Sequence, residues 1–200
     1  SSVEARGNSY VMARENSSVM AWENSSVEAW ENSSVEAWGN VQVVDRQERG
    51  IIQLQGNARI VFMPKTIHEF MDFYGIKHDK KKALFYKAVR RWNGKLVSDY
   101  SNNFEYVIGE VKTEPNCNMD IEESCGQGIH ISHLAWALNY GRNWSNLAII
   151  EVETDIDKIV LPKNTDGKVR TSEVKVLREV PLEECGLFGK MLVKERTKNN

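Results

Sequence analysis

The stretch SSVEAWENSSVEAWGN, residues 25–40, states one eight-residue phrase twice with almost no change. Three related copies precede it, SSVEARGN, SYVMAREN and SSVMAWEN, so the repeats cover residues 1–40 without a gap. Serine always holds the first position, valine the third, alanine the fifth and asparagine the eighth. A period of eight with alternating character does not fit the 3.6 residues per turn of a helix, and it predicts short β-strands.

Side chains alternate between the two faces of a strand, so the Ser, Val and Ala positions share one face. This small, mostly apolar face should point inward, because the other face carries Glu4, Glu28 and Glu36, which cannot be buried without partners. One such strand buries almost nothing alone. Stacked copies form a continuous thin core, which predicts a β-solenoid with either two or three repeats per coil.

The eighth position closes each repeat as Gly-Asn or Glu-Asn. We expect these pairs to form the turns, with the asparagine in the left-handed region of φ, and the asparagines to form ladders between coils or to serve as corner residues. The alternative for residues 1–40 is low-complexity disorder, since Ser, Asn, Glu and Gly dominate. The strict spacing of valine and alanine argues against disorder, because a solvated linker has no need of it.

Tryptophans occupy the sixth position, on the outward face. In a coil of two repeats, Trp22 would stack on Trp38, whereas Trp30 would follow Arg14 on the opposite side. Outward tryptophans predict either a surface for binding and self-association or simple cover for neighbouring coils.

After residue 40 the alternation continues with larger apolar residues, and Gly-Asn returns at residues 56–57, seventeen residues after Asn40 rather than sixteen. We expect terminal capping coils that complete the solenoid over residues 1–63. Residues 64–82 are expected to hold a capping helix and a linker, because Thr66 and Glu69 form a capping box and Gly75 follows.

Residues 83–200 contain many strand patterns, one short helix and no alternation of strand and helix, which predicts a small α+β domain. Asn93-Gly94 predicts a hairpin turn, and Ser132 is expected to cap a helix that ends at Gly141. A polar loop is expected over 113–127, and the last sixteen residues fit a strand or a helix. Strands are expected at ALFYKAV, KLVSDY, EYVIGEV, GIHIS, LAIIEVET and, as the longest, VRTSEVKVLREV.

The formal net charge of −2 gives no general reason to expect a nucleic-acid or membrane partner. No run of eighteen apolar residues occurs, so no membrane-spanning helix is expected. Three irregularly spaced cysteines, Cys117, Cys125 and Cys185, do not make a disulfide framework, and a reducing cytoplasm is the expected location. The chain opens in phase with the repeat, without a signal peptide, so we expect a piece of a longer array.

The sequence lacks the common catalytic motifs. No glycine-rich phosphate loop and no GxSxG nucleophile elbow occurs. Cys125, His130 and His133 are candidate metal ligands, but their spacing matches no common zinc pattern and the two histidines fall in different elements, so no metal site is expected. Nothing in the sequence places a histidine to activate Cys125 as a nucleophile.

Three short motifs follow one another along the chain: Phe85-Tyr86-Lys87, Gly128-Ile129-His130-Ile131-Ser132 and Glu173. They resemble the core of ADP-ribosyltransferase-like domains, in which a Tyr-(His or Arg)-Gly strand, a Gly-Ile-Tyr-Phe-Ala strand and a late glutamate occur in the same order. Two positions depart from the family, because Lys87 stands where His or Arg is usual, with no glycine after it, and His130 replaces the stacking tyrosine.

The resemblance implies that Glu173 is catalytic and stabilises the oxocarbenium-like state formed as nicotinamide leaves NAD. It also implies that Lys87, His130 and Ser132 bind NAD, which is the possible substrate; no firm cofactor is expected. The structural alternative is that His130 is a strand residue bonded within the fold and Glu173 a carboxylate on the sheet surface.

Nearly the whole chain also resembles a domain family of phage and gut-bacterial proteins that follows octapeptide repeat arrays and has no established activity. Two functions are therefore expected as alternatives. The first is an ADP-ribosyltransferase-like domain that binds NAD or a related nucleotide on a β-solenoid stalk. The second is a non-catalytic interaction or adaptor module, in which the solenoid spaces or multimerises a phage or bacterial assembly. A protein partner and self-association through the solenoid are expected.

Overall fold

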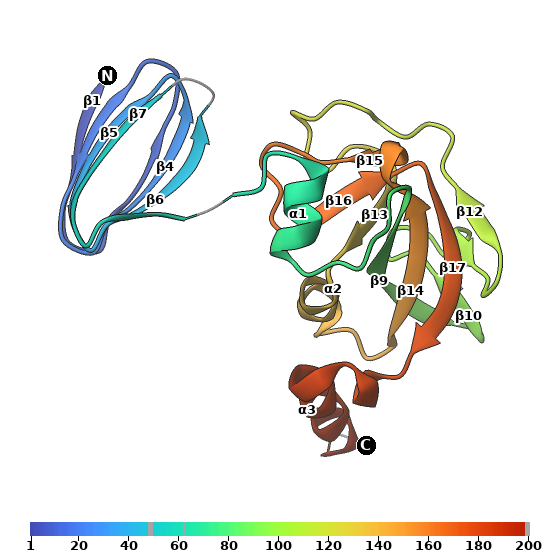
Figure 1. Ribbon diagram of the computed structural model, residues 1–200. Helices are drawn as coiled ribbons and strands as arrows, with labels where there is room; N and C mark the ends of the chain where they lie inside the picture. Colours follow the sequence, from blue (N-terminus) through green and yellow to red (C-terminus); the bar gives the residue numbers. More distant parts are fainter. Residues whose placement is uncertain (48–49, 62, 199–200) are drawn as a thin grey trace. The chain divides into compact units, whose positions relative to one another are not determined.

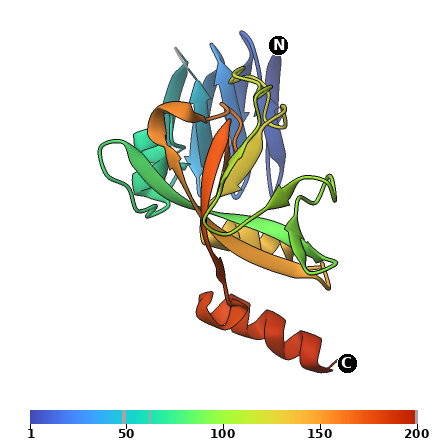
Figure 2. The same cartoon turned by 90° about the vertical axis from the view of Figure 1, so that its right-hand side faces the viewer.

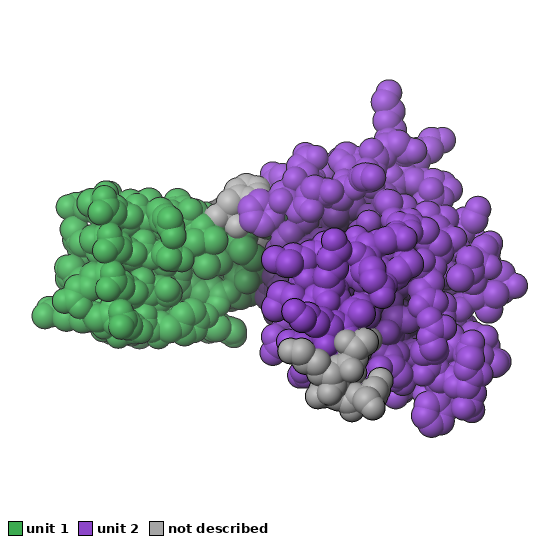
Figure 3. All heavy atoms as spheres, turned by 90° about the horizontal axis from the view of Figure 1, so that it is seen from below, with its two compact units in different colours: residues 1–64 green, residues 65–200 purple. Residues whose placement is uncertain are grey.

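The computed structural model describes residues 1–47, 50–61 and 63–198. The chain divides into two compact units, Ser1–Pro64 and Lys65–Asn200 (Figures 1 and 3). Within the described residues, no helix has both the length and the apolar character needed to cross a membrane.

The first unit is a β-solenoid of about four turns, as predicted. Val3 pairs in parallel with Val19, and Val19 with Val35, so these successive coils are sixteen residues apart. Two four-stranded sheets result. One consists of β1 (Ser2–Ala5), β3 (Ser18–Ala21), β5 (Ser34–Gly39) and β7 (Ile51–Gly56), and the other of β2 (Tyr10–Ala13), β4 (Ser26–Glu31), β6 (Gln42–Gln47) and β8 (Arg59–Val61). Residues 48, 49 and 62 of the expected terminal coils lie outside the described residues.

The predicted facing of the repeats is confirmed. Val27 and Ala29 are fully buried, whereas Glu28 between them is half-buried on the outer face. Ser25 is also buried, and its hydroxyl donates to the carbonyl oxygen of Trp22 at 2.8 Å. The small inward serine thus satisfies its own polar group inside the corner of the coil.

The turns differ from the prediction in one respect. The residue with positive φ is the one before each asparagine, not the asparagine. In the columns formed by successive coils these residues are Gly7, Glu23, Gly39 and Gly56 on one corner and Glu15 and Glu31 on the other. Glycine takes this conformation freely, whereas glutamate does so at a steric cost that the stacked coils must offset.

On one corner of the solenoid, three asparagines form the expected ladder. The side-chain amide of Asn40 donates to the Oδ1 atom of Asn24 at 3.2 Å, and the amide of Asn57 donates to the Oδ1 atom of Asn40 at 3.2 Å. The one-residue insertion after Asn40 therefore leaves the ladder in register, because Gly39 still pairs with Gly56.

Two outward rows run along the solenoid. In the first row (Arg6, Trp22, Trp38), the two indole rings stack as predicted, with centroids 5.1 Å apart and planes 9° apart, and the Arg6 guanidinium lies 5.0 Å from the Trp22 ring. The second row (Arg14, Trp30, Arg46) places a guanidinium on each side of the Trp30 ring, at 5.6 and 5.1 Å.

The second unit is built around a nine-stranded sheet in the order β12-β17-β14-β9-β13-β16-β15, with β10 and β11 added beside β9. Figures 1 and 2 show the two long strands β9 and β14 side by side, paired antiparallel. The bounds are β9 (Lys82–Trp92), β10 (Lys95–Val97), β11 (Glu105–Tyr106), β12 (Val111–Thr113), β13 (Ile129–Ser132), β14 (Leu147–Asp155), β15 (Ile159–Val160), β16 (Lys168–Thr171) and β17 (Glu173–Val180).

Three α-helices belong to this unit: α1 (Ile67–Phe73), α2 (Leu134–Gly141) and α3 (Gly186–Lys198). The predicted capping box of Thr66 and Glu69 begins α1, whose Phe70 and Met71 are buried in the main core of the unit. The C-terminal segment, which fitted a strand or a helix, forms α3, and short 3-10 turns lie at Ile156–Lys158 and Leu182–Glu184.

Two of the expected strands are each divided. EYVIGEV separates into β11 and β12, because Gly109 has a φ of +88° and turns the chain between them. VRTSEVKVLREV separates at Ser172 into β16 and β17, which occupy different places in the sheet. β16 pairs with β13 and β15, whereas β17 pairs with β14 and β12. β9 is therefore the longest strand among the described residues, at eleven residues.

The prediction that Ser132 caps the following helix is wrong. The N-cap of α2 is His133, whose Nδ1 atom accepts from the backbone amide of Trp136 at 3.4 Å. Ser132 is the last residue of β13, is buried, and donates its hydroxyl to the carbonyl oxygen of His133 at 3.1 Å. The strand thus continues one residue further than the capping pattern suggested.

Candidate functional site

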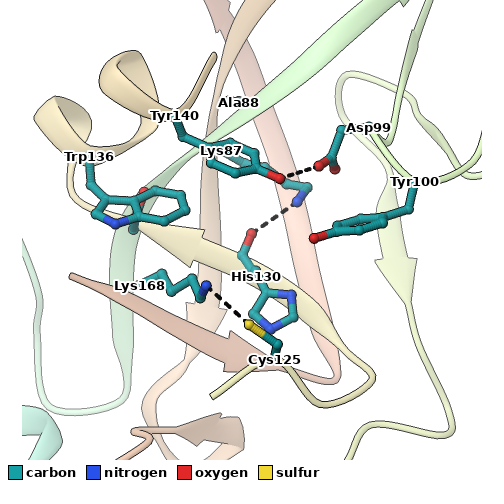
Figure 4. Close-up of a pocket in the computed structure, with 10 residues that line it drawn as sticks. Lys87, Ala88, Asp99, Tyr100, Cys125, His130, Trp136, Tyr140 and Lys168 are labelled. Carbon is teal, nitrogen blue, oxygen red and sulfur yellow. Dashed lines mark hydrogen bonds between the residues drawn. The ribbon is translucent and has the colours of Figure 1, made fainter. Parts of the chain in front are cut away.

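A cavity of about 40 Å³ in the second unit collects polar and aromatic side chains from several segments (Figure 4). The antiparallel pairing of β13 with both β9 and β16 brings these segments together. The lining residues are Lys87 and Ala88 of β9, Asp99 and Tyr100 of the loop after β10, Cys125 of the loop before β13, His130 and Ser132 of β13, Trp136 and Tyr140 of α2, and Lys168 of β16.

Lys87 is a buried charged group of this cavity. It lies between Phe85 and Val89 on the same face of β9, which points into the core, and only 9% of the residue is exposed. Its Nζ atom donates to the carbonyl oxygen of His130 at 3.0 Å and lies 5.7 Å from the Tyr106 ring. Burial lowers the pKa of Lys87 from 10.5 to about 8, and Asp99 opposes this shift. The ammonium form therefore still predominates at neutral pH.

His130 is neutral at the same pH. Burial, and then the positive charges of Lys87 and Lys168, lower the pKa of His130 from 6.5 to about 4. Its Nε2 atom is buried and has no hydrogen-bond partner among the residues that the structure describes. A neutral imidazole with one unpaired nitrogen is able to donate to or accept from a molecule that enters the cavity.

Asp99 is the carboxylate in the lining, and it is engaged. The Tyr140 hydroxyl donates to its Oδ2 atom, and the Ser98 hydroxyl lies 3.4 Å from its Oδ1 atom. Burial and this bond raise the pKa of Tyr140. The Tyr140 ring also stacks on Trp136, with centroids 4.9 Å apart, which fixes both rings on α2.

A second cation faces the same space. The Nζ atom of Lys168 lies 3.5 Å from the sulfur of Cys125 and 5.4 Å from the Trp136 ring. The lining contains two lysines, Lys87 and Lys168, and one carboxylate, Asp99, so it has an excess of positive charge. Such a cavity favours an anionic ligand over a cation.

Arg170 fixes the polar loop before β13, which contributes Cys125 to the cavity lining. It is fully buried and donates to three loop carbonyl oxygens: those of Asn118 at 2.6 Å, Asp120 at 2.7 Å and Glu123 at 2.7 Å. Gly128 packs against its side chain so closely that a Cβ atom there would lie 2.4 Å from the Cγ atom of Arg170.

The structure brings together Lys87, His130 and Ser132, three of the four residues that sequence analysis assigned to a site. Glu173, the expected catalytic carboxylate, is not among the lining residues. Its Oε1 atom accepts from the Nζ atom of Lys158 at 2.9 Å.

The three candidate metal ligands do not form one cluster. Cys125 and His130 line the cavity, whereas His133 caps α2 and stacks on Tyr74, with centroids 4.2 Å apart. Across the described part of the chain, no group of three His, Cys, Asp or Glu side chains is arranged to hold a metal ion.

Most of the lining residues were not among the residues predicted from the sequence. Trp136 and Tyr140 carried a usable signal, because residues four apart share one face of a helix. Asp99 and Tyr100 carried none, because they reach the cavity through the loop after β10. Lys168 follows the Asp-Gly turn, and its role depends on the pairing of β16 with β13.

Comparison with known proteins gives one informative similarity. Gabija anti-defense 2 of Bacillus phage SPbetaL7 is 34% identical over 113 residues, which cover 54% of this chain and 28% of that protein. The chain thus spans little more than a quarter of the length of this curated relative. The matched share is longer than Ser1–Pro64, so it includes part of the second unit.

No protein-family model and no solved structure matches the chain. The resemblance to ADP-ribosyltransferase-like domains therefore gains no support from these comparisons. The chain is similar, over about half its length, to a phage protein.

Proposed function

We propose that this chain is a non-catalytic interaction module of a phage protein that counteracts a bacterial defence. The observation that carries the proposal is the similarity to Gabija anti-defense 2, a phage protein whose name describes action against a defence. A protein of this kind needs a surface that holds a partner, and the solenoid supplies an extended one.

The two outward rows are the surfaces to which we assign partner binding. Stacked coils place like residues at regular intervals along the solenoid, and repeat proteins bind partners along such extended faces. Tryptophan and arginine, which make up both rows, are the residue types that most often dominate binding energy at protein interfaces. The occupant is a protein of the defence, and a second copy of the chain is the alternative occupant of the same rows.

The NAD-cleaving alternative has less support. It requires a carboxylate beside the bound ribose, but Glu173 pairs with Lys158 outside the cavity that contains Lys87 and His130. The cavity of about 40 Å³ is also far smaller than the roughly 300–1,000 Å³ of ordinary small-molecule sites.

The test is a plaque assay in a bacterium that carries the Gabija defence and expresses this chain. We expect plaque counts of a restricted phage to rise in proportion to the amount of chain, because a binding module acts on its target in a fixed ratio. A variant with all three outward tryptophans changed to serine should lose the effect. Sedimentation of the same variant tells whether the rows also hold a second copy.

Glu173→Gln is the matched control, because it removes one charge far from both rows in the sequence and spares the solenoid. Interaction without catalysis predicts that this variant protects the phage as well as the wild type. Full protection at trace levels of the chain, or its loss in Glu173→Gln alone, would contradict the proposal. So would plaque counts that do not rise when folded chain is present in excess.

A further inference from the structure

The cavity of the second unit contains a buried cation, Lys87, whose donors are only partly used in the described contacts. Partner binding through the solenoid does not explain this feature. The ammonium of Lys87 has three protons, and the described contacts account for one bond to the carbonyl oxygen of His130 and a ring contact with Tyr106. A buried ammonium that forms no ion pair among the described residues is costly, because the protein interior does not replace its lost hydration. A ligand with negative charge would offset this cost.

Three donors surround the same space, from three different strands. They are the ammonium groups of Lys87 on β9 and Lys168 on β16, and the unpaired Nε2 atom of His130 on β13. Figure 4 shows these groups together with the rings of Tyr100, Trp136 and Tyr140 around the cavity. The carboxylate of Asp99 is turned to the Tyr140 hydroxyl, which reduces its repulsion of an anion.

The size of the cavity limits what enters it. A volume of about 40 Å³ exceeds the roughly 10–15 Å³ that a single water needs, so the cavity has room for a small group. A phosphoryl group has three non-ester oxygens, which match the three donors, whereas a carboxylate has two. Lysine binds phosphate as a compact point charge and needs no planar geometry.

We propose that this cavity binds a phosphate monoester, with the phosphoryl oxygens on Lys87, Lys168 and the Nε2–H group of His130. The organic part of the ester lies at the mouth of the cavity, beside Tyr100. That residue is 82% exposed, so its ring is available to pack on an incoming group.

Isothermal titration calorimetry of the full chain with phenyl phosphate, inorganic phosphate and benzoate tests the proposal. We expect phenyl phosphate and inorganic phosphate to bind. Benzoate has the ring, but it carries one negative charge and two oxygens where phenyl phosphate carries about 1.5 to 2 charges and three non-ester oxygens. It should bind at least tenfold more weakly, because a charge-assisted hydrogen bond and part of the charge attraction are lost. Equal affinity for benzoate and phenyl phosphate would overturn the phosphate assignment. Absence of binding by both phosphates would overturn the site.

Variants then locate the binding. Lys87→Met and Lys168→Met should each weaken phenyl phosphate binding by roughly tenfold or more, because each removes a hydrogen bond to a charged group. Lys158→Met is the matched control, since this lysine of the same unit is outside the lining and pairs with Glu173. Thermal unfolding confirms that each variant is folded, and Lys168→Met decides if Lys87→Met does not fold.

Wild-type affinity in both cavity variants, or equal weakening in Lys158→Met, would refute the assignment to this cavity. The outcome is independent of the plaque assay, because the cavity belongs to the second unit and the tryptophan rows to the first.

Discussion

Glu23, at a corner of the solenoid, allows a sharp test of how the turns are built. Its φ is +64°, and the residues above and below it in the same column, Gly7 and Gly39, are glycines with φ of +69° and +80°. A side chain in the left-handed region costs roughly 1–2 kcal/mol. Glycine costs about 0.4–1 kcal/mol through the freedom it adds to the unfolded chain. Glu23→Gly should therefore stabilise the solenoid by about 0.5–1 kcal/mol.

Hydrogen exchange of the whole chain measures this change locally. The amides of β3 and β5 should exchange about two- to fivefold more slowly in Glu23→Gly, since 1.4 kcal/mol corresponds to a factor of ten. Glu36→Gly, in the extended part of β5, is the matched control and should accelerate exchange, because glycine weakens a strand. Gly39→Ala should also accelerate it, because its Cβ atom would lie 3.3 Å from the backbone of Glu23 in a left-handed residue. A shift in the same direction for Glu23→Gly and Glu36→Gly would refute the reasoning.

Three further predictions concern the second unit. Gly128→Ala places a Cβ atom 2.4 Å from Arg170 and should lower the free energy of unfolding by about 2–3 kcal/mol in a denaturant titration; an unchanged midpoint would contradict the close packing. Lys87→Met should raise the free energy of unfolding at pH 7 by about 1–3 kcal/mol, because the pKa of Lys87 falls from 10.5 in the unfolded chain to about 8 in the fold. This gain should vanish as the pH rises from 8 to 10.5 and the folded wild type loses the proton; thermal melts that show a constant gain would reject the cause. Thr66→Ala removes the oxygen that accepts from the Glu69 amide at 3.2 Å and should cost about 1 kcal/mol, whereas no change in denaturant midpoint would show that the cap is dispensable.

The solenoid could be predicted because one pattern sets the facing of every strand, as the buried Val27 beside the outward Glu28 illustrates. The turn could not be predicted in the same way. Asparagine is the better left-handed residue by local preference, yet Glu23 takes that conformation. Contacts between coils determine which residue takes the left-handed conformation, because the side chain of Asn24 is hydrogen-bonded to Asn40 of the next coil.

The site was accessible to sequence analysis only in part. Lys87 and His130 lie on strands that the residue pattern identifies, and those strands meet in the fold. Their chemistry depends on tertiary structure, because the cavity walls come from a loop after β10 and from α2. Glu173 was assigned from the order of motifs, and that order carries no information on which strand β17 pairs with or on the ion pair with Lys158.

Successive strands of the solenoid alternate between two sheets, so a change in the number of repeats during evolution has a different effect for even and odd numbers. Near-identical copies of a short segment are prone to gain or lose units by unequal recombination. A change of sixteen residues adds or removes one coil, about 4.8 Å of length, and every later strand keeps its sheet. A change of eight residues transfers every later strand to the other sheet, so the chain leaves the solenoid on the opposite side. Descendants that differ by an even number of units keep the side on which the chain leaves the solenoid, and those that differ by an odd number reverse it.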